Sequence, residues 1–273
     1  MKQLEGIKHL LYPVEKVKSE DILPGYEYTS AQEYAIVVDK GNGVKKIVNH
    51  CSNIYEIAHN KETIETLVKG FGNLDFTVQG TGRFDSRFAF DFIFRDESLA
   101  IQKGDEIFPK LRMNNSYDGR VRWAFNLGFF RMICTNGMVV PVEGFEDSNI
   151  SLKMRHTPAL GEYLDTDTLL EMVHDFKRGI KDFSAPYKEL QKKPVINIED
   201  RIQEVIENTK FPARRAEDAV DRVLEEMVIL KVAPSKINDW MIYNGLNYQL
   251  NHSTDIKMDT HKREILDQSI LSF

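Results

Sequence analysis

Four phenylalanines occupy every second position of one short segment, and this spacing restricts the fold more than any other feature of the chain. They are Phe88, Phe90, Phe92 and Phe94. Side chains along a β-strand point alternately to its two faces, so this spacing places all four rings on one face. Such a face is stabilised by removal from water. The segment 87–95 is therefore predicted to be a strand with one face in the hydrophobic core.

Strand-like patterns continue on both sides of this segment. Apolar and polar residues alternate in 110–114 and 121–128, and a further strand-like run over 129–140 includes a turn at 134–137. Short connections that contain glycine join these segments, which favours antiparallel pairing because parallel strands need long crossovers. Nearer the N-terminus, the β-branched runs Tyr34–Val38 and Val44–Val48 flank a glycine turn and predict a hairpin.

The spacing of the apolar residues changes to a helical period after about residue 160. Apolar stripes at this period cover 169–183, 198–206, 216–228 and 240–250. A threonine and a glutamate, Thr168 and Glu171, have the spacing of a capping box at the start of the first stripe. The sequence therefore predicts an α+β fold, with a central antiparallel meander and a mainly helical C-terminal half.

These patterns suggest three regions. Residues 1–33 are mixed in character and interrupted by proline, which is typical of an N-terminal arm. Residues 34–160 are predicted to form the β-rich core, with one or two short helices between residues 53 and 69. Residues 161–273 are predicted to be helical and to pack on the same core.

Charge, cysteine content and apolar runs limit the class of protein. The net charge of −6 argues against generic electrostatic binding of nucleic acid but allows a local basic face. Two cysteines are too few for a disulfide framework. The N-terminus lacks the apolar run of a signal peptide, and no segment reaches the roughly 20 apolar residues of a membrane span. We therefore expect a cytoplasmic protein that makes no membrane contact.

Two small polar segments bracket the strand predicted after residue 120. The first is Asn115-Ser116-Tyr117-Asp118-Gly119, and the second contains Cys134 and Asn136. The first segment is either a tight turn, since these are the residue types that turns require, or a loop that contacts a ligand. Cys134 alternates with Phe130 and Met132, which favours a buried cysteine over a nucleophile.

Cofactor and metal motifs are absent from the sequence. It contains no Walker loop, no dinucleotide fingerprint and no metalloprotease helix. His50, Cys51 and His59 do not have the spacing of a familiar zinc site. We expect neither a cofactor nor a metal ion.

Basic residues concentrate in the β-rich segment and form the strongest candidate binding feature. The candidates for contacts with nucleic acid are Arg87, Lys110, Arg112, Arg120, Arg122 and Arg131, with Tyr117 or Trp123 as a residue that could stack on a base. A basic sheet face with nearby aromatic rings can follow a single-stranded backbone. Aspartates and glutamates in the same segment support a second interpretation, in which cross-strand ion pairs use these charges without any ligand.

The segment Leu111–Asn136 resembles the core of a phage- and plasmid-borne protein family of unknown function. The matching residues are Asn115 to Gly119 and, after a strand, Arg131-Met132-Ile133-Cys134-Thr135-Asn136. Many members of that family carry a histidine where Tyr117 stands. Phe71–Phe94 and Trp240–Tyr248 also look like the family, so the resemblance extends over residues 30–255.

The resemblance implies a genomic setting and no particular reaction. The leading hypothesis is a non-enzymatic phage or plasmid protein that binds nucleic acid, above all single-stranded DNA, in replication or recombination. One alternative is a phage protein that counters a host defence through protein or small-ligand binding. Another is an enzyme that uses Asp118 and Cys134. The sequence leaves open whether the chain is an enzyme and whether it forms a homo-oligomer.

Overall fold

The computed structural model describes residues 2–41, 43–132, 136–139, 151–162, 166–253 and 260–273. These residues fold into antiparallel sheets and helices, with most of the helices in the C-terminal half, which confirms the predicted α+β class. The chain divides into two compact units that alternate along the sequence. Unit 1 contains residues 1–96, 111–126 and 151–174, and unit 2 contains residues 97–110, 127–150 and 175–273.

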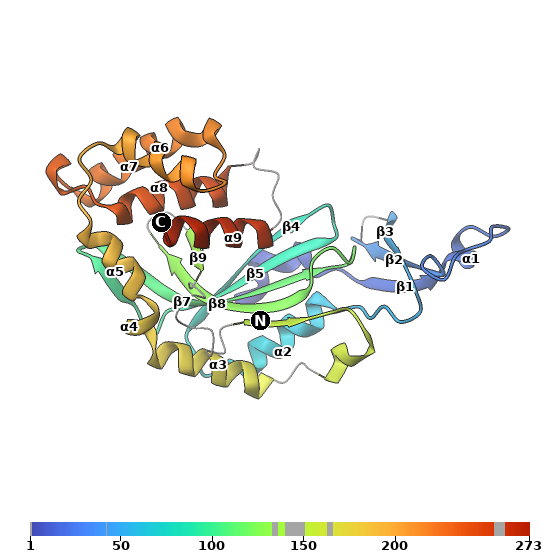
Figure 1. The fold of residues 1–273 in the computed structure, drawn as a ribbon. Helices are drawn as coiled ribbons and strands as arrows, with labels where there is room; N and C mark the ends of the chain where they lie inside the picture. The colour runs from blue at the N-terminus through green and yellow to red at the C-terminus, as the bar shows by residue number, and fades with distance from the viewer. Residues whose placement is uncertain (1, 42, 133–135, 140–150, 163–165, 254–259) are drawn as a thin grey trace. The chain divides into compact units, whose positions relative to one another are not determined.

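A small antiparallel sheet of three strands belongs to unit 1 (Figure 1). Its strands are β1 (Val14–Lys18), β2 (Tyr34–Asp39) and β3 (Lys45–Cys51), in that order. The predicted hairpin is confirmed by the pairing of β2 with β3. A short helix, α1 (Ser19–Ile22), follows β1. The predicted N-terminal arm therefore supplies one edge strand to this sheet.

The larger sheet has seven strands in the order β10-β8-β7-β5-β4, with β6 paired to β7 and β9 paired to β8. The strands are β4 (Phe76–Arg83), β5 (Arg87–Phe94), β6 (Leu99–Gln102), β7 (Asp105–Ser116), β8 (Trp123–Arg131), β9 (Asn136–Val139) and β10 (Ser151–Met154). Strands that follow one another along the chain are neighbours for most of its width, as predicted for a meander. The long strands β7 and β8 each contribute residues to both units.

The four alternating phenylalanines of β5 are all buried, as their spacing predicts. Phe92 and Phe94 contact Phe71, which follows helix α2 (Asn60–Gly70). At the other end of the strand, Phe88 and Phe90 are stacked on each other, with ring centroids 6.2 Å apart. One face of the β5 strand thus contributes four aromatic rings to the core of unit 1.

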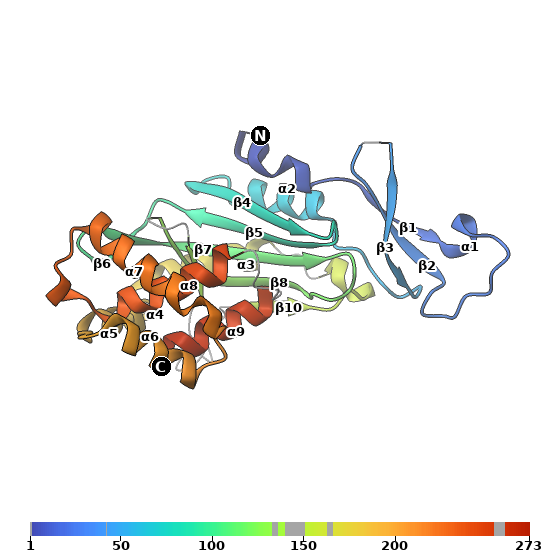
Figure 2. The same cartoon turned by 90° about the horizontal axis from the view of Figure 1, so that it is seen from above.

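A short helix at the N-terminus, η1 (Lys2–Leu10), packs on β4 (Figure 2). This contact requires a glycine on the strand, because a Cβ atom at Gly80 would lie 2.9 Å from Ile7 Cγ2 and 2.8 Å from Phe90 Cδ1. The glycine pair Gly80 and Gly82 is therefore explained by the close approach of η1, which buries Ile7 and Leu10.

The four predicted helical stripes become α3 with α4, α6, α7 and α8, with shifted ends. In chain order, the helices after α2 are η2 (Pro158–Glu162), α3 (Thr166–Arg178), α4 (Ile180–Phe183), α5 (Ala185–Lys192), α6 (Ile198–Asn208), η3 (Ala213–Arg215), α7 (Ala216–Leu230), η4 (Pro234–Lys236), α8 (Asp239–His252) and α9 (Thr260–Leu271). The first stripe is interrupted at Gly179. The α8 helix begins after Asn238, whose side chain accepts a hydrogen bond from the Met241 amide at 3.2 Å. In unit 2, α7 packs against both α6 and α8 (Figure 1).

A fully buried ion-pair network lies in the core of unit 2. The Arg131 guanidinium on β8 donates to both Asp105 carboxylate oxygens at 2.6 Å and to Glu226 Oε1 at 2.8 Å. The Trp240 indole N–H donates to Asp105 Oδ2 at 2.7 Å. The network therefore joins β7, β8, α7 and α8. The prediction that Arg131 contacts phosphate is wrong, because its side chain has no exposed area and two carboxylates neutralise it.

Removing one charge from this network should destabilise the protein strongly. We expect Asp105→Asn to lower the free energy of unfolding by about 3 kcal/mol, because the Arg131 charge would remain buried with less compensation. Denaturant unfolding monitored by circular dichroism measures this loss. The control is Glu204→Gln, which removes an exposed ion pair with Arg201 and should cost less than about 1 kcal/mol. Equal effects of the two substitutions would contradict the proposed importance of the network.

Candidate functional site

The segment Asn115–Gly119 ends β7 and forms a tight turn in unit 1. The Ser116 hydroxyl donates to the Val121 carbonyl at 2.9 Å and accepts from the Val121 amide at 3.0 Å. Gly119 has a φ of +69°, which favours glycine. An Asp118 carboxylate oxygen accepts from the Arg120 amide at 3.1 Å. These contacts account for the residue types of the segment as those of a turn.

Buried polar contacts attach this turn to the start of α2. The Asn115 side-chain amide donates to the Ala58 carbonyl at 2.6 Å and to Asn60 Oδ1 at 2.7 Å. The Tyr117 hydroxyl accepts from the Asn60 amide at 3.2 Å. Asn60 is fully buried. The sequence did not indicate that Asn60 binds the Asn115–Gly119 turn, because the two segments are distant in sequence and meet only in the fold. Residues 53–59, predicted to be partly helical, form the non-helical connection that these bonds hold.

The structure excludes stacking of either candidate aromatic residue on a base. Tyr117 is 1% exposed and Trp123 is 2% exposed. The Tyr117 ring contacts Phe88 at a centroid distance of 5.0 Å. Burial also raises the pKa of the Tyr117 hydroxyl to about 12. Both residues belong to the core, as the alternation around Trp123 indicates.

Carboxylates neutralise several of the basic residues that the sequence suggests for phosphate binding. Arg87 donates to Asp118 Oδ2 at 2.6 Å, and Arg112 makes two hydrogen bonds of 2.7 Å to Asp91. Lys110 is a further candidate and is 3% exposed. Ion pairing or burial therefore accounts for Arg87, Lys110 and Arg112. These residues and Arg131 do not form an open basic face. Arg120 and Arg122 are exposed.

The structure describes no contact between Asp118 and Cys134 that would support an enzyme active site. Cys134 lies outside the described residues. Asn136 is opposite Arg131 in the pairing of β8 with β9. Only the backbone of Asn136 belongs to the described part of the structure. The Asp118 carboxylate accepts hydrogen bonds from Arg87 and from the Ser86 hydroxyl.

A hollow of about 410 Å³ opens beside the turn in unit 1. Its lining comes from the end of β3, the connection before α2, the turn before β8 and the residues that follow β10. The lining residues are Asn49, His50, Cys51, Tyr55, Gly119, Val121, Arg122, Arg155 and His156. None of them carries a carboxylate, whereas two carry a guanidinium and two an imidazole. The lining is therefore basic although the whole chain is acidic.

Two arginines, Arg122 and Arg155, line the hollow together. Trp123 pairs with Met154 at the end of the β8–β10 ladder, and Arg122 and Arg155 are the residues just beyond this pair. Both are exposed, and among the described residues neither guanidinium has an ion-pair partner. An anion bound in the hollow would compensate the positive charge of both side chains.

One wall of the hollow is held rigidly by His156. Its Nδ1 and Nε2 atoms lie 3.1 Å from the Glu56 carbonyl oxygen and 3.3 Å from the Val121 carbonyl oxygen. The ring stacks on Tyr55 with centroids 5.1 Å apart, and the Tyr55 hydroxyl donates to the Ser116 carbonyl at 3.2 Å. These bonds connect the hollow directly to the Asn115–Gly119 turn.

The thiol that lines the hollow is not activated. Burial raises the pKa of Cys51 above its ordinary value, with a smaller opposing effect from Lys16. A raised pKa keeps the thiol protonated near neutral pH, so Cys51 has the character of a packing residue.

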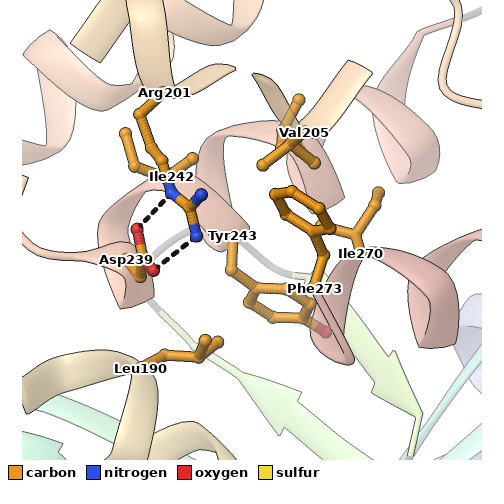
Figure 3. Close-up of a pocket in the computed structure, with 9 residues that line it drawn as sticks. Leu190, Arg201, Val205, Asp239, Ile242, Tyr243, Ile270 and Phe273 are labelled. Carbon is orange, nitrogen blue, oxygen red and sulfur yellow. Dashed lines mark hydrogen bonds and ion pairs between the residues drawn. The ribbon is translucent and has the colours of Figure 1, made fainter. Parts of the chain in front are cut away.

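A second hollow, in unit 2, is too small for a ligand (Figure 3). Its volume of about 10 Å³ corresponds to about one water molecule. Arg201 points toward it, but the guanidinium makes two hydrogen bonds, at 2.9 and 2.8 Å, to Asp239. The remaining lining is mostly apolar and includes Phe273.

The chain belongs to a family defined as a domain of unknown function, DUF932, which it matches over residues 48–268. The match covers both the turn segment and the hollow. No curated protein and no solved structure matches the chain. The described residues contain no group of three or more His, Cys, Asp or Glu side chains arranged for a metal ion. Their helices include none with both the length and the apolar content that a bilayer crossing requires.

Acid should weaken the fold through His156. Burial lowers the pKa of this ring below the ordinary 6.5, and the smaller effects of the two carbonyl hydrogen bonds and Asp118 oppose the shift. The unfolded chain therefore takes up a proton near pH 6.5 that the folded chain resists, so stability is lost as the pH falls from about 6.5 through the lower folded pKa.

Urea unfolding between pH 7.5 and pH 5 tests this expectation. His156→Gln should flatten the decline of stability with falling pH. The control is His174→Gln, which changes an exposed histidine of unit 1 and should retain the decline of the unsubstituted protein. Identical pH profiles for His156→Gln and the unsubstituted protein would contradict the role assigned to this ring.

Proposed function

We propose that this chain is a non-enzymatic phage or plasmid protein that binds single-stranded DNA in the host cytoplasm during replication or recombination. Arg120, Arg122 and Arg155 would contact the phosphates. The observation that carries the proposal is the basic hollow, whose two arginines, Arg122 and Arg155, lack carboxylate partners among the described residues. The resemblance of Leu111–Asn136 to phage- and plasmid-borne proteins supplies the genomic setting.

The distribution of charge supports binding at this position. Arg87 and Arg112 are neutralised by Asp118 and Asp91, whereas the guanidinium groups of Arg122 and Arg155 are exposed. Arginine suits phosphate because its planar group can donate two parallel hydrogen bonds. A local basic site also explains how a chain of net charge −6 could bind a polyanion.

A small-ligand function is the second candidate, and the size of the hollow favours it. Small-molecule sites commonly have volumes of about 300 to 1,000 Å³, and the hollow of 410 Å³ lies in that range. In this alternative, a phage protein would counter a host defence by capturing a small anionic compound. Binding to such a compound would compete with binding to DNA at the same arginines.

The test is the affinity of the purified chain, freed of nucleic acid, for labelled single-stranded DNA. We expect binding that weakens as salt increases, because protein cations release counterions from the phosphates. Arg122→Gln combined with Arg155→Gln should reduce the affinity about tenfold or more at low salt. Fluorescence anisotropy at several salt concentrations measures both effects.

The matched control is Arg95→Gln, which removes an exposed arginine of unit 1 that does not line the hollow. It should change the affinity less than twofold. Absence of binding at low salt would refute the proposed function. An equal loss of affinity in the control would show that the DNA contacts lie elsewhere or are diffuse.

A further inference from the structure

We propose that the hollow recognises a terminal phosphate group, a phosphomonoester, at the end of a single strand. This inference deepens the proposed function and rests on it for the identity of the polymer. The Arg122–Arg155 site is defined as the part of the hollow between these two side chains, with His50, Asn49 and the Gly119 turn around it.

The charge of a phosphomonoester matches that of the two arginines in the lining. A phosphomonoester carries a charge of about −1.5 to −2 near pH 7, whereas each internal phosphodiester carries −1. Arg122 and Arg155 both line the hollow, and neither has a carboxylate partner among the described residues. One doubly charged group can therefore compensate both arginines at once, and an internal phosphate compensates half of their charge.

Carboxylates neutralise two arginines of the sheet that could otherwise follow a strand. A protein that follows a strand through its internal phosphates needs successive exposed cations. Arg112 is paired with Asp91 and Arg87 with Asp118. The two arginines that line the hollow have no such carboxylate partner among the described residues, which favours recognition of a single phosphate there.

The lining of the hollow is rich in hydrogen-bond donors. A terminal phosphate presents three oxygens that are free to accept hydrogen bonds. Arg122 and Arg155 each carry a guanidinium group with several N–H donors, and Asn49 of β3 also belongs to the lining. The lining includes no carboxylate that would repel the group.

Three oligonucleotides of one sequence test the inference, with a 5′-phosphate, a 3′-phosphate or no terminal phosphate and with the same internal label. We expect one phosphorylated end to raise the affinity of the full chain about tenfold over the unphosphorylated oligonucleotide. Arg155→Gln and Arg122→Gln should each abolish this preference, and Arg95→Gln should retain it. Anisotropy titrations at constant salt measure the ratio of the affinities for the phosphorylated and unphosphorylated oligonucleotides.

Competition experiments distinguish recognition of a strand end from recognition of a free nucleotide. A nucleoside 5′-monophosphate should displace the phosphorylated oligonucleotide only at concentrations well above those of an unlabelled phosphorylated competitor oligonucleotide. Displacement at equal or lower concentration would overturn recognition of a strand end in favour of a free nucleotide. Inorganic phosphate should also raise the thermal midpoint of the unsubstituted chain more than that of Arg155→Gln.

The two proposals fail in different ways. Equal affinity for all three oligonucleotides would overturn recognition of a terminal phosphate and leave binding of single-stranded DNA intact. Absence of binding to every oligonucleotide, with a shift of the thermal midpoint by inorganic phosphate, would overturn the DNA proposal. That second result would support the phosphate chemistry of the Arg122–Arg155 site.

Discussion

The position of the hollow depends on buried hydrogen bonds between two segments that are distant in sequence. Asn115 on β7 donates to the connection before α2 and to Asn60, and Tyr117 accepts from the Asn60 amide. A buried polar group that lacks a partner costs about 1 to 3 kcal/mol, so these bonds strongly favour one placement of the turn. Tyr55 extends the connection to His156 through its hydroxyl and its ring. The turn thereby fixes two sides of the hollow.

Pairing with carboxylates determines which arginines remain available for a ligand. Arg131 is neutralised within the core, and Arg87 and Arg112 are neutralised on the sheet. These ion pairs have structural roles. A buried ion pair adds little net stability, but removing one of its partners is strongly destabilising. Arg122 and Arg155 differ because both line the hollow and neither has a carboxylate partner among the described residues. The positive charge of these two side chains is therefore available to an anion.

Much of the fold could be predicted from the sequence, because periodicity reports burial directly. The alternation of Phe88 to Phe94 identified a core strand, and the apolar stripes identified α6, α7 and α8. The site was predicted only in part, because the sequence shows which residues are basic but not which carboxylates pair with them. Arg131 was a candidate for phosphate binding, but its guanidinium donates to Asp105 and Glu226 in the core. Arg155 was missed because it lines the hollow only through contacts between distant segments, which a single sequence does not specify.

The contact between Tyr117 and Asn60 shows that the aromatic residue of the turn has a structural role. The Tyr117 hydroxyl accepts a hydrogen bond from the backbone amide of Asn60, which is the first residue of α2. Amides of the first helical turn have no partner within the helix, so an acceptor from elsewhere is required when they are buried. Tyr117 supplies this acceptor while its ring packs on Phe88 in the core. Tyr117 is therefore a structural support of the hollow rather than a group that contacts a ligand.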